Sequence, residues 1–204
     1  VPMAQTLEDL LDALEDVDDA TREEASKALG ELADPATLDA LIGACGDEYW
    51  TVRAHAGWGV ARIGGPKAVE ALIVLFNDSI MEVRNEAVAA MASMGATVVD
   101  RLIIALKDER WRVREHAAKT CGEIKDQKTV EALIPVCRDR DGAVKSAVAE
   151  ALGKIGDPRA ITVLIKFFRD PSKTVRETAG TALISIGQPS VDPLIDCLKD
   201  KDFV

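Results

Sequence analysis

Residues 139–158 read DRDGAVKSAVAEALGKIGDP, and this stretch contains the signals that start and stop a helix. Apolar side chains recur every three or four residues after Val144, which is the spacing of an amphipathic helix. Gly156 is typical of a helix C-cap, and Pro158 favours the start of the next helix. The stretch therefore predicts one bounded helix followed closely by a second.

The same pattern recurs along the chain with a period near 31 residues. The motif D-x4-V-R, with one lysine variant, appears as DEYWTVR at 47–53, DSIMEVR at 78–84, DERWRVR at 108–114, DRDGAVK at 139–145 and DPSKTVR at 170–176. Its aspartates are 31, 30, 31 and 31 residues apart, and a degenerate copy begins at Asp16. A fixed period of this length indicates a repeat architecture.

Each repeat also contains a second apolar helix, such as AVEALIVLF at 68–76. Two amphipathic helices cannot bury both of their apolar stripes alone, so neighbouring repeats are expected to stack into an α-solenoid. We predict an all-α chain forming a single domain over 1–204. Residues 1–15 form an N-terminal cap helix, 16–199 form six repeats of about 31 residues, and 200–204 begin a truncated further repeat.

These motifs resemble HEAT repeats of the short kind found in phycobilisome lyases, and the resemblance covers nearly the whole chain. It implies a right-handed superhelix of helical hairpins, with the D-x4-V-R helices lining its concave side. It implies less about activity, because repeat scaffolds serve many partners.

Composition excludes several classes of function. The net charge of −10 disfavours nucleic acid as a partner. No apolar run is long enough for a membrane span, and the start VPMAQTLEDL does not show the basic and then apolar layout of a signal peptide. The four cysteines have no CxxC spacing and lie in apolar stretches, so we expect buried free thiols and a cytoplasmic protein.

The charged pairs of the motif recur in every repeat, whereas catalysis needs one site. We therefore interpret them as a structural ladder, with each aspartate at a helix N-cap and each inward base bridging the aspartates of adjacent repeats. The ladder residues are Asp47, Arg53, Asp78, Arg84, Asp108, Arg114, Asp139, Lys145, Asp170 and Arg176.

Two histidines, His55 and His116, occupy the same place in their repeats. Deoxyhypusine hydroxylase, a HEAT-like metalloenzyme, uses His-Glu pairs to hold iron, but this chain contains no His-Glu dipeptide. We therefore expect solvent-facing histidines, with no metal, no cofactor and no catalytic residue.

Large side chains occupy outward places of the first helices that no apolar stripe requires. Trp50, Met81 and Trp111 hold one equivalent place and should form a row, with Trp58 nearby. His55 and His116 should flank this row, and Glu82, Glu86, Arg112 and Glu115 should form its charged rim. Exposed aromatics ringed by charge are typical of protein-binding hot spots.

The segment RAHAGWGVARIGG at 53–65 is expected to be helical through residue 63, with Gly64 as its C-cap. Gly57 and Gly59 each cost about 1 kcal/mol within a helix. Two explanations are open: the Trp58 indole needs the space, or the backbone of a partner comes close.

The sequence thus predicts a non-catalytic scaffold that binds a protein or peptide with basic residues on the concave face. The alternative is a phycobilin lyase-type subunit that binds a linear tetrapyrrole, as the family resemblance implies. We expect a monomer, or weak self-association through the uncapped C-terminal end.

Overall fold

The computed structural model describes residues 6–199, which form 13 α-helices and six short 3-10 helices and contain no β-strand. The predicted all-α class is therefore confirmed. The chain is divided into two compact units at the bond between Val98 and Val99. The start of the predicted cap segment, 1–5, and the predicted further repeat, 200–204, lie outside the described residues.

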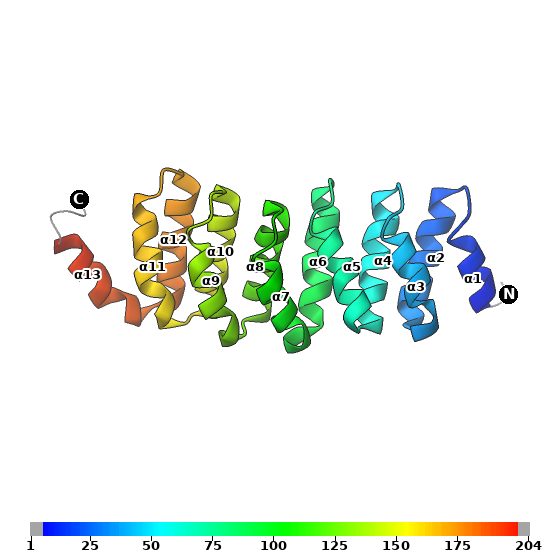
Figure 1. The fold of residues 1–204 in the computed structure, drawn as a ribbon, viewed down its shortest axis with the longest axis horizontal. Coiled ribbons are helices and arrows are strands. Elements are labelled where there is room, and N and C mark those ends of the chain that lie inside the picture. Colours follow the sequence, from blue (N-terminus) through cyan, green and yellow to red (C-terminus); the bar gives the residue numbers. More distant parts are fainter. Residues whose placement is uncertain (1–5, 200–204) are drawn as a thin grey trace. The chain divides into compact units, whose positions relative to one another are not determined.

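The first unit is a stack of helical hairpins (Figure 1). The first helices of its repeats lie side by side, α2 against α4 and α4 against α6, while α3 and α5 pack beside them. The elements are α1 (Leu7–Ala13), α2 (Asp19–Leu32), η1 (Pro35–Thr37), α3 (Leu38–Ala44), α4 (Trp50–Ile63), α5 (Pro66–Leu75), α6 (Met81–Ser93) and η2 (Gly95–Val98).

The second unit repeats this arrangement, with α10 packed between α8 and α12. Its second helices, α9 and α11, pack against the first helices that follow them, α10 and α12. The elements are α7 (Val99–Ala105), α8 (Trp111–Ile124), η3 (Gln127–Thr129), α9 (Val130–Val136), α10 (Gly142–Ile155), η4 (Pro158–Ala160), α11 (Ile161–Lys166), η5 (Phe167–Arg169), α12 (Lys173–Ile186), η6 (Gln188–Ser190) and α13 (Val191–Lys199).

The valine of the repeated motif anchors the core of every repeat. All five of these valines are completely buried: Val52, Val83, Val113, Val144 and Val175. Burying a valine side chain stabilises a fold by about 1.5–3 kcal/mol. Each repeat of about 31 residues therefore contributes an equivalent buried valine to the core.

At several glycines, a neighbouring helix approaches so closely that a side chain would not fit. A Cβ atom on Gly30 would lie 2.9 Å from the Cα atom of Gly59, and one on Gly153 would lie 2.7 Å from the Cα atom of Ala182. A Cβ atom on Gly57 would lie 2.9 Å from the side chain of Leu75. Both sequence-based explanations of Gly57 and Gly59 are therefore wrong, because these glycines make room for the chain's own helices.

Helix ends follow the predicted pattern with two exceptions. The helix containing RAHAGWGVARIGG ends at Ile63, and Gly64 follows it with a φ of 77°. Ala33 and Lys125 take the equivalent position after α2 and α8 with φ values of 51° and 58°. The left-handed end is thus imposed by the stack even where the residue is not glycine.

Candidate functional site: an ion-pair ladder and exposed aromatic side chains

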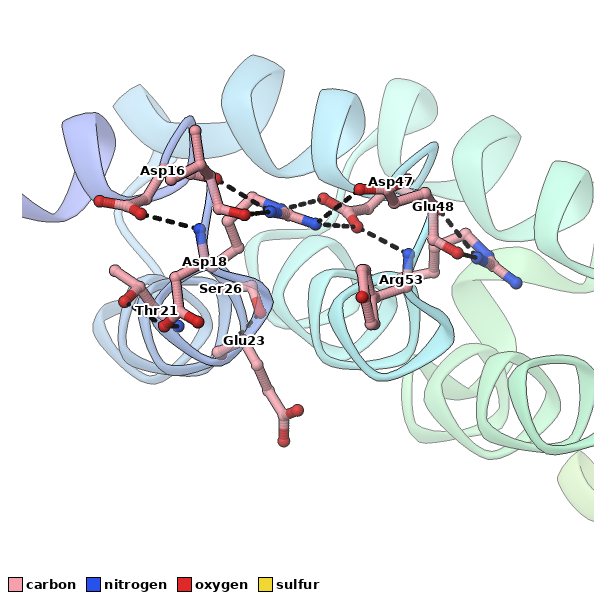
Figure 2. Close-up of polar contacts among 11 residues, drawn as sticks. Asp16, Asp18, Thr21, Glu23, Ser26, Asp47, Glu48 and Arg53 are labelled. Carbon is pink, nitrogen blue, oxygen red and sulfur yellow. Dashed lines mark hydrogen bonds and ion pairs between the residues drawn. The ribbon is translucent and has the colours of Figure 1, made fainter.

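Ion pairs connect successive repeats within each unit. In the first unit Arg22 pairs with Asp47 and Arg53 with Asp78, each at 2.7 Å between Nε and Oδ2. Figure 2 shows the loops around the first of these pairs, with Asp16, Asp47 and Arg53 labelled. In the second unit the pairs are Arg114 with Asp139, at 2.6 Å, and Lys145 with Asp170. Each pair joins residues 25 positions apart.

The arginines also hold the loop that precedes their own helix. Nη1 of Arg53 donates to the carbonyl oxygens of Asp47 and Glu48, at 2.8 and 3.0 Å. Arg22, Arg84, Arg114 and Arg176 make the same two bonds to carbonyls six and five residues earlier. Lys145 has a single charged nitrogen and lacks the planar fork that makes this double contact possible.

The ladder aspartates do not cap their helices, which corrects the sequence-based expectation. The N-cap of α4 is Tyr49, and Oδ1 of Asp47 accepts the Tyr49 backbone N–H at 2.8 Å. Asp78 accepts from Ile80, the N-cap of α6, in the same way. Each aspartate lies two residues before the cap, and the carboxylates of Asp47, Asp78, Asp139 and Asp170 also bind the base of the preceding repeat.

The surroundings of these carboxylates keep them ionised. The hydrogen bond from Arg22, the largest influence, lowers the pKa of Asp47. For Asp139 burial is the largest single influence and raises the pKa, but the hydrogen bonds and charges around it, led by Arg114, leave the pKa below its ordinary value. Asp108 is paired with Arg110, at 2.9 Å, and its pKa is lowered by that hydrogen bond. The ladder is thus a charged frame rather than a set of proton donors.

Exposed aromatic side chains gather at the start of α4. Tyr49 and Trp50 are each 43% exposed, and Met81, at the start of α6, is 56% exposed. Tyr49, Trp50 and Ile80 line a groove of about 490 Å³ together with ladder residues. The guanidinium of Arg22 lies over the Tyr49 ring, 5.5 Å from its centroid.

Trp58 lies half-buried in the middle of α4 and ties that helix to α6. Its indole Nε1 donates to Oε2 of Glu86 at 2.8 Å. Trp58 and His55 line a cavity of about 210 Å³. Nδ1 of His55 is buried without a hydrogen-bond partner among the described residues, with the carboxylate of Glu23 3.9 Å away. Glu82 and Glu86 are both exposed on α6.

The corresponding residues of the second unit are arranged differently. Trp111 is 37% exposed, and the guanidinium of Arg112 lies 4.9 Å from its ring centroid. Glu115 pairs with Lys119 at 2.7 Å. His116 is only 2% exposed, and its Nδ1 lies 2.7 Å from the carbonyl oxygen of Arg112. The expectation that His116 faces solvent is therefore wrong, because its ring turns into the stack.

The predicted aromatic row is divided between the two units. Trp50 and Met81 belong to the first unit, and Trp111 belongs to the second. Each unit therefore presents its own candidate surface for a partner.

Three cysteines are buried, as expected, and Cys197 is half-buried. Burial raises the pKa of Cys45, Cys121 and Cys137 to about 12, so these thiols are protonated at neutral pH. Within residues 6–199 no three His, Cys, Asp or Glu side chains are grouped to hold a metal ion.

No single helix between residues 6 and 199 has both the length and the apolar character needed to cross a membrane. Only α6 and the segment Gly95–Ala105 reach that length and composition when taken together, and a sharp bend separates them.

Solved structures similar to this chain are helical repeat proteins and their relatives. An engineered protein is 23% identical over 89% of this chain and 96% of its own, with a TM-score of 0.50. A chain from a structure of Kap95p with RanGDP has 14% sequence identity to this chain. The match covers 88% of this chain and 30% of the other, with a TM-score of 0.67. A chain from the complex of CpcE and CpcF of phycocyanin lyase from Nostoc sp. is 23% identical over 73% of this chain and 99% of its own, with a TM-score of 0.56. At these identities the likeness shows the fold alone.

A search of curated proteins finds no match to this chain. The model of HEAT repeats, in contrast, matches residues 7–92 and 99–183, which together make up most of the sequence. The chain belongs to the HEAT-repeat family.

Proposed function

We propose that this protein is a non-catalytic scaffold that binds a protein or peptide through the first helices of its repeats. The observation that carries the proposal is the exposure of Trp50, at 43%, in the lining of a groove of about 490 Å³, and of Met81, at 56%, next in sequence to the lining residue Ile80. The aromatic and methionine side chains that the core needs, such as Phe76 and Met91, are completely buried. Large apolar side chains left at a groove are typical anchors for a partner.

The charge around these anchors favours a partner with basic residues. Glu48, beside Trp50, has a side chain that is 79% exposed. Glu82 and Glu86 are exposed along α6, and Glu86 is held in place by the Trp58 indole. Such a rim selects partners by charge and raises the association rate, while the buried aromatic area supplies most of the affinity.

Trp111, Arg112 and Glu115 would form a separate contact in the second unit. The cation over the Trp111 ring already satisfies one face of that indole. We therefore assign the main anchors to Trp50, Trp58 and Met81. His55 adds an unpaired ring nitrogen beside Trp58, whereas the buried His116 has only a positioning role.

A double variant, Trp50→Ala with Met81→Ala, tests the proposal. The probe is a short fluorescein-labelled peptide that alternates arginine with leucine, and binding is measured by fluorescence anisotropy. We expect a loss of affinity of at least about tenfold, since anchor side chains each contribute about 2 kcal/mol or more. Val74→Ala is the matched control, because Val74 is 61% exposed on α5 of the same unit.

Two outcomes would contradict the proposal. The double variant binds the peptide as well as the parent protein, or it unfolds, which would show that the two side chains belong to the core. Trp111→Ala, measured separately, is expected to change the affinity less than the double variant does.

The alternative function is the binding of a linear tetrapyrrole. The cavity beside Trp58, at about 210 Å³, is below the roughly 300–1,000 Å³ of typical small-molecule sites, whereas the groove lined by Tyr49 and Trp50, at about 490 Å³, lies within that range. Incubation with a linear tetrapyrrole separates the two functions, because a bound pigment changes its visible absorbance. No shift is expected, and a saturable shift would favour the alternative.

A further inference from the structure

A groove of about 660 Å³ in the second unit carries an excess of positive charge. It is lined by the end of α9, by α11 and η5, and by ladder residues. Five of its side chains are basic, Arg138, Lys145, Arg159, Lys166 and Arg169, and two are acidic, Asp139 and Asp170. This excess stands out in a chain with a net charge of −10.

The two acidic side chains are already neutralised by ladder partners. Arg114 pairs with Asp139, and Lys145 pairs with Asp170. Among the bases, Arg159 is held by Asp157 at 2.7 Å and by Glu131 at 2.9 Å. The lining of the groove therefore offers no unpaired carboxylate to Arg138 or Lys166.

Arg138 and Lys166 are both exposed, and neither has an ion-pair partner within the described part of the chain. They come from different elements, Arg138 from the loop after α9 and Lys166 from the end of α11. Two unpaired cations that line one groove from different elements provide a site for anionic groups.

Apolar side chains line the same groove. These are Ile134, Pro135 and Val163, together with Phe167, which is only 5% exposed. An apolar surface beside two cations fits a chain segment that presents carboxylates and an apolar side chain. Single-stranded nucleic acid fits less well, because its bases stack on exposed aromatic rings and Phe167 is only 5% exposed.

We infer that the groove between Arg138 and Lys166 binds an acidic peptide segment of a partner protein, with an apolar residue of the segment against Pro135 and Val163. This site is separate from the aromatic surface of the first unit and opposite to it in charge preference. We call it the Arg138 groove.

The test is the binding of a short fluorescein-labelled peptide that alternates glutamate with leucine, measured by anisotropy on the full chain. The double variant Arg138→Glu with Lys166→Glu is expected to weaken binding by at least about tenfold. The matched control is Lys125→Glu with Lys128→Glu, because both lysines are exposed in the same unit and outside the groove. The control has the same net charge as the double variant and is expected to keep the affinity of the parent protein. Circular dichroism confirms that both variants keep their helices.

Three results would overturn the inference. The first is no saturable binding of the peptide by the parent protein, and the second is an equal loss of affinity in both double variants. The third is displacement of the labelled peptide by an oligothymidine of equal charge at the same concentration as by unlabelled peptide, which would show a general polyanion site. Self-association of the parent protein that Arg138→Glu with Lys166→Glu abolishes would instead identify a second copy as the occupant.

Discussion

Each unit carries a groove beside the ladder, and the two grooves share only part of their lining: Gly46, Asp47 and Asp78 of the first hold the places of Arg138, Asp139 and Asp170 of the second. Counted from the ladder aspartates, Gly46, Val74 and Asn77 of the first unit correspond to Arg138, Lys166 and Arg169 of the second. The aromatic residues Tyr49 and Trp50 of the first unit correspond to Asp141 and Gly142 of the second. One groove is aromatic and the other is basic, although the valines and aspartates beneath them recur unchanged.

This difference shows which positions the stack constrains. The ladder and the buried valines must recur because each repeat buries its neighbour's surface. The exposed residues at the grooves, such as Trp50, Arg138 and Lys166, belong to neither the ladder nor the core, and they can change without a large cost in folding free energy. The repeat architecture thus allows two binding surfaces of different chemistry on one scaffold.

The largest expected effect is on the ladder beneath both grooves. Arg53→Ala and Arg114→Ala should each lower the free energy of unfolding by about 3 kcal/mol, because each leaves a buried aspartate without its partner. The side chains of Asp78 and Asp139 are both 9% exposed. Urea unfolding measures the change, and Lys128→Ala is an exposed control. Losses below about 1 kcal/mol would show that the pairs behave as surface ion pairs.

The close helix contacts should respond next. Gly153→Ala and Gly30→Ala should each cost about 1–3 kcal/mol, because the added methyl groups meet backbone atoms of the next helix. Gly43→Ala is the matched change, since nothing lies within 4 Å of a Cβ atom at that position. It should stabilise α3 by up to about 1 kcal/mol. A different order of thermal stability among the three variants would show that the close helix contacts do not act alike in the two units.

Acid should weaken the ladder of both units. A carboxyl group with a lowered folded pKa stabilises the fold above its unfolded pKa, and this contribution is lost as the pH falls through the folded value. For Asp47 and Asp139 the ordinary pKa is 3.8 and the folded pKa is lower. The cost of Asp47→Asn or Asp139→Asn should therefore be full at pH 7 and shrink below about pH 4. Urea midpoints measured across this range check the direction, and a cost that grows with acidity would contradict it.

The smallest expected effect is the transfer of a preference for acidic peptides to the first unit. Val74→Lys with Asn77→Arg places two of the second unit's basic residues in the first unit. The variant should gain about three- to fivefold in affinity for the glutamate–leucine peptide, since each exposed charge pair contributes about 0.2–1 kcal/mol. The peptide titration is repeated with Arg138→Glu and Lys166→Glu also present, so that only the new site is measured. No gain would mean that the apolar walls, and not charge, decide binding.

Much of the fold could be predicted from single residues and their spacing. Val144, Gly156 and Pro158 indicate a helix, its end and the next helix, because these preferences act within a few residues. The Asp–Arg recurrence also predicts the bridging pairs. It predicts each aspartate at the helix N-cap, however, whereas the aspartates lie two residues before it. The competing contact to the preceding repeat is long-range and leaves no local signal.

The candidate sites could be predicted from the sequence less well than the fold. Trp50 and Met81 could be assigned to outward places by counting, but His116 was assigned to the surface and is buried. Gly57 and Gly59 looked like room for a partner, whereas they accommodate Leu75, Leu41 and Gly30. The Arg138 groove was missed, although comparison of Arg138 with Gly46 at the same place would have indicated it.

The sequence by itself determined the all-α class, the period and the residues that each repeat buries, because helix signals and apolar spacing are local properties. Only the tertiary structure decided how closely the helices approach, which way the His116 ring turns, and which side chains of different repeats share a groove. Several of those features depend on contacts between residues that are distant in the sequence, such as Arg114 and Asp139, which are 25 positions apart. Their energies arise only when the stack is formed.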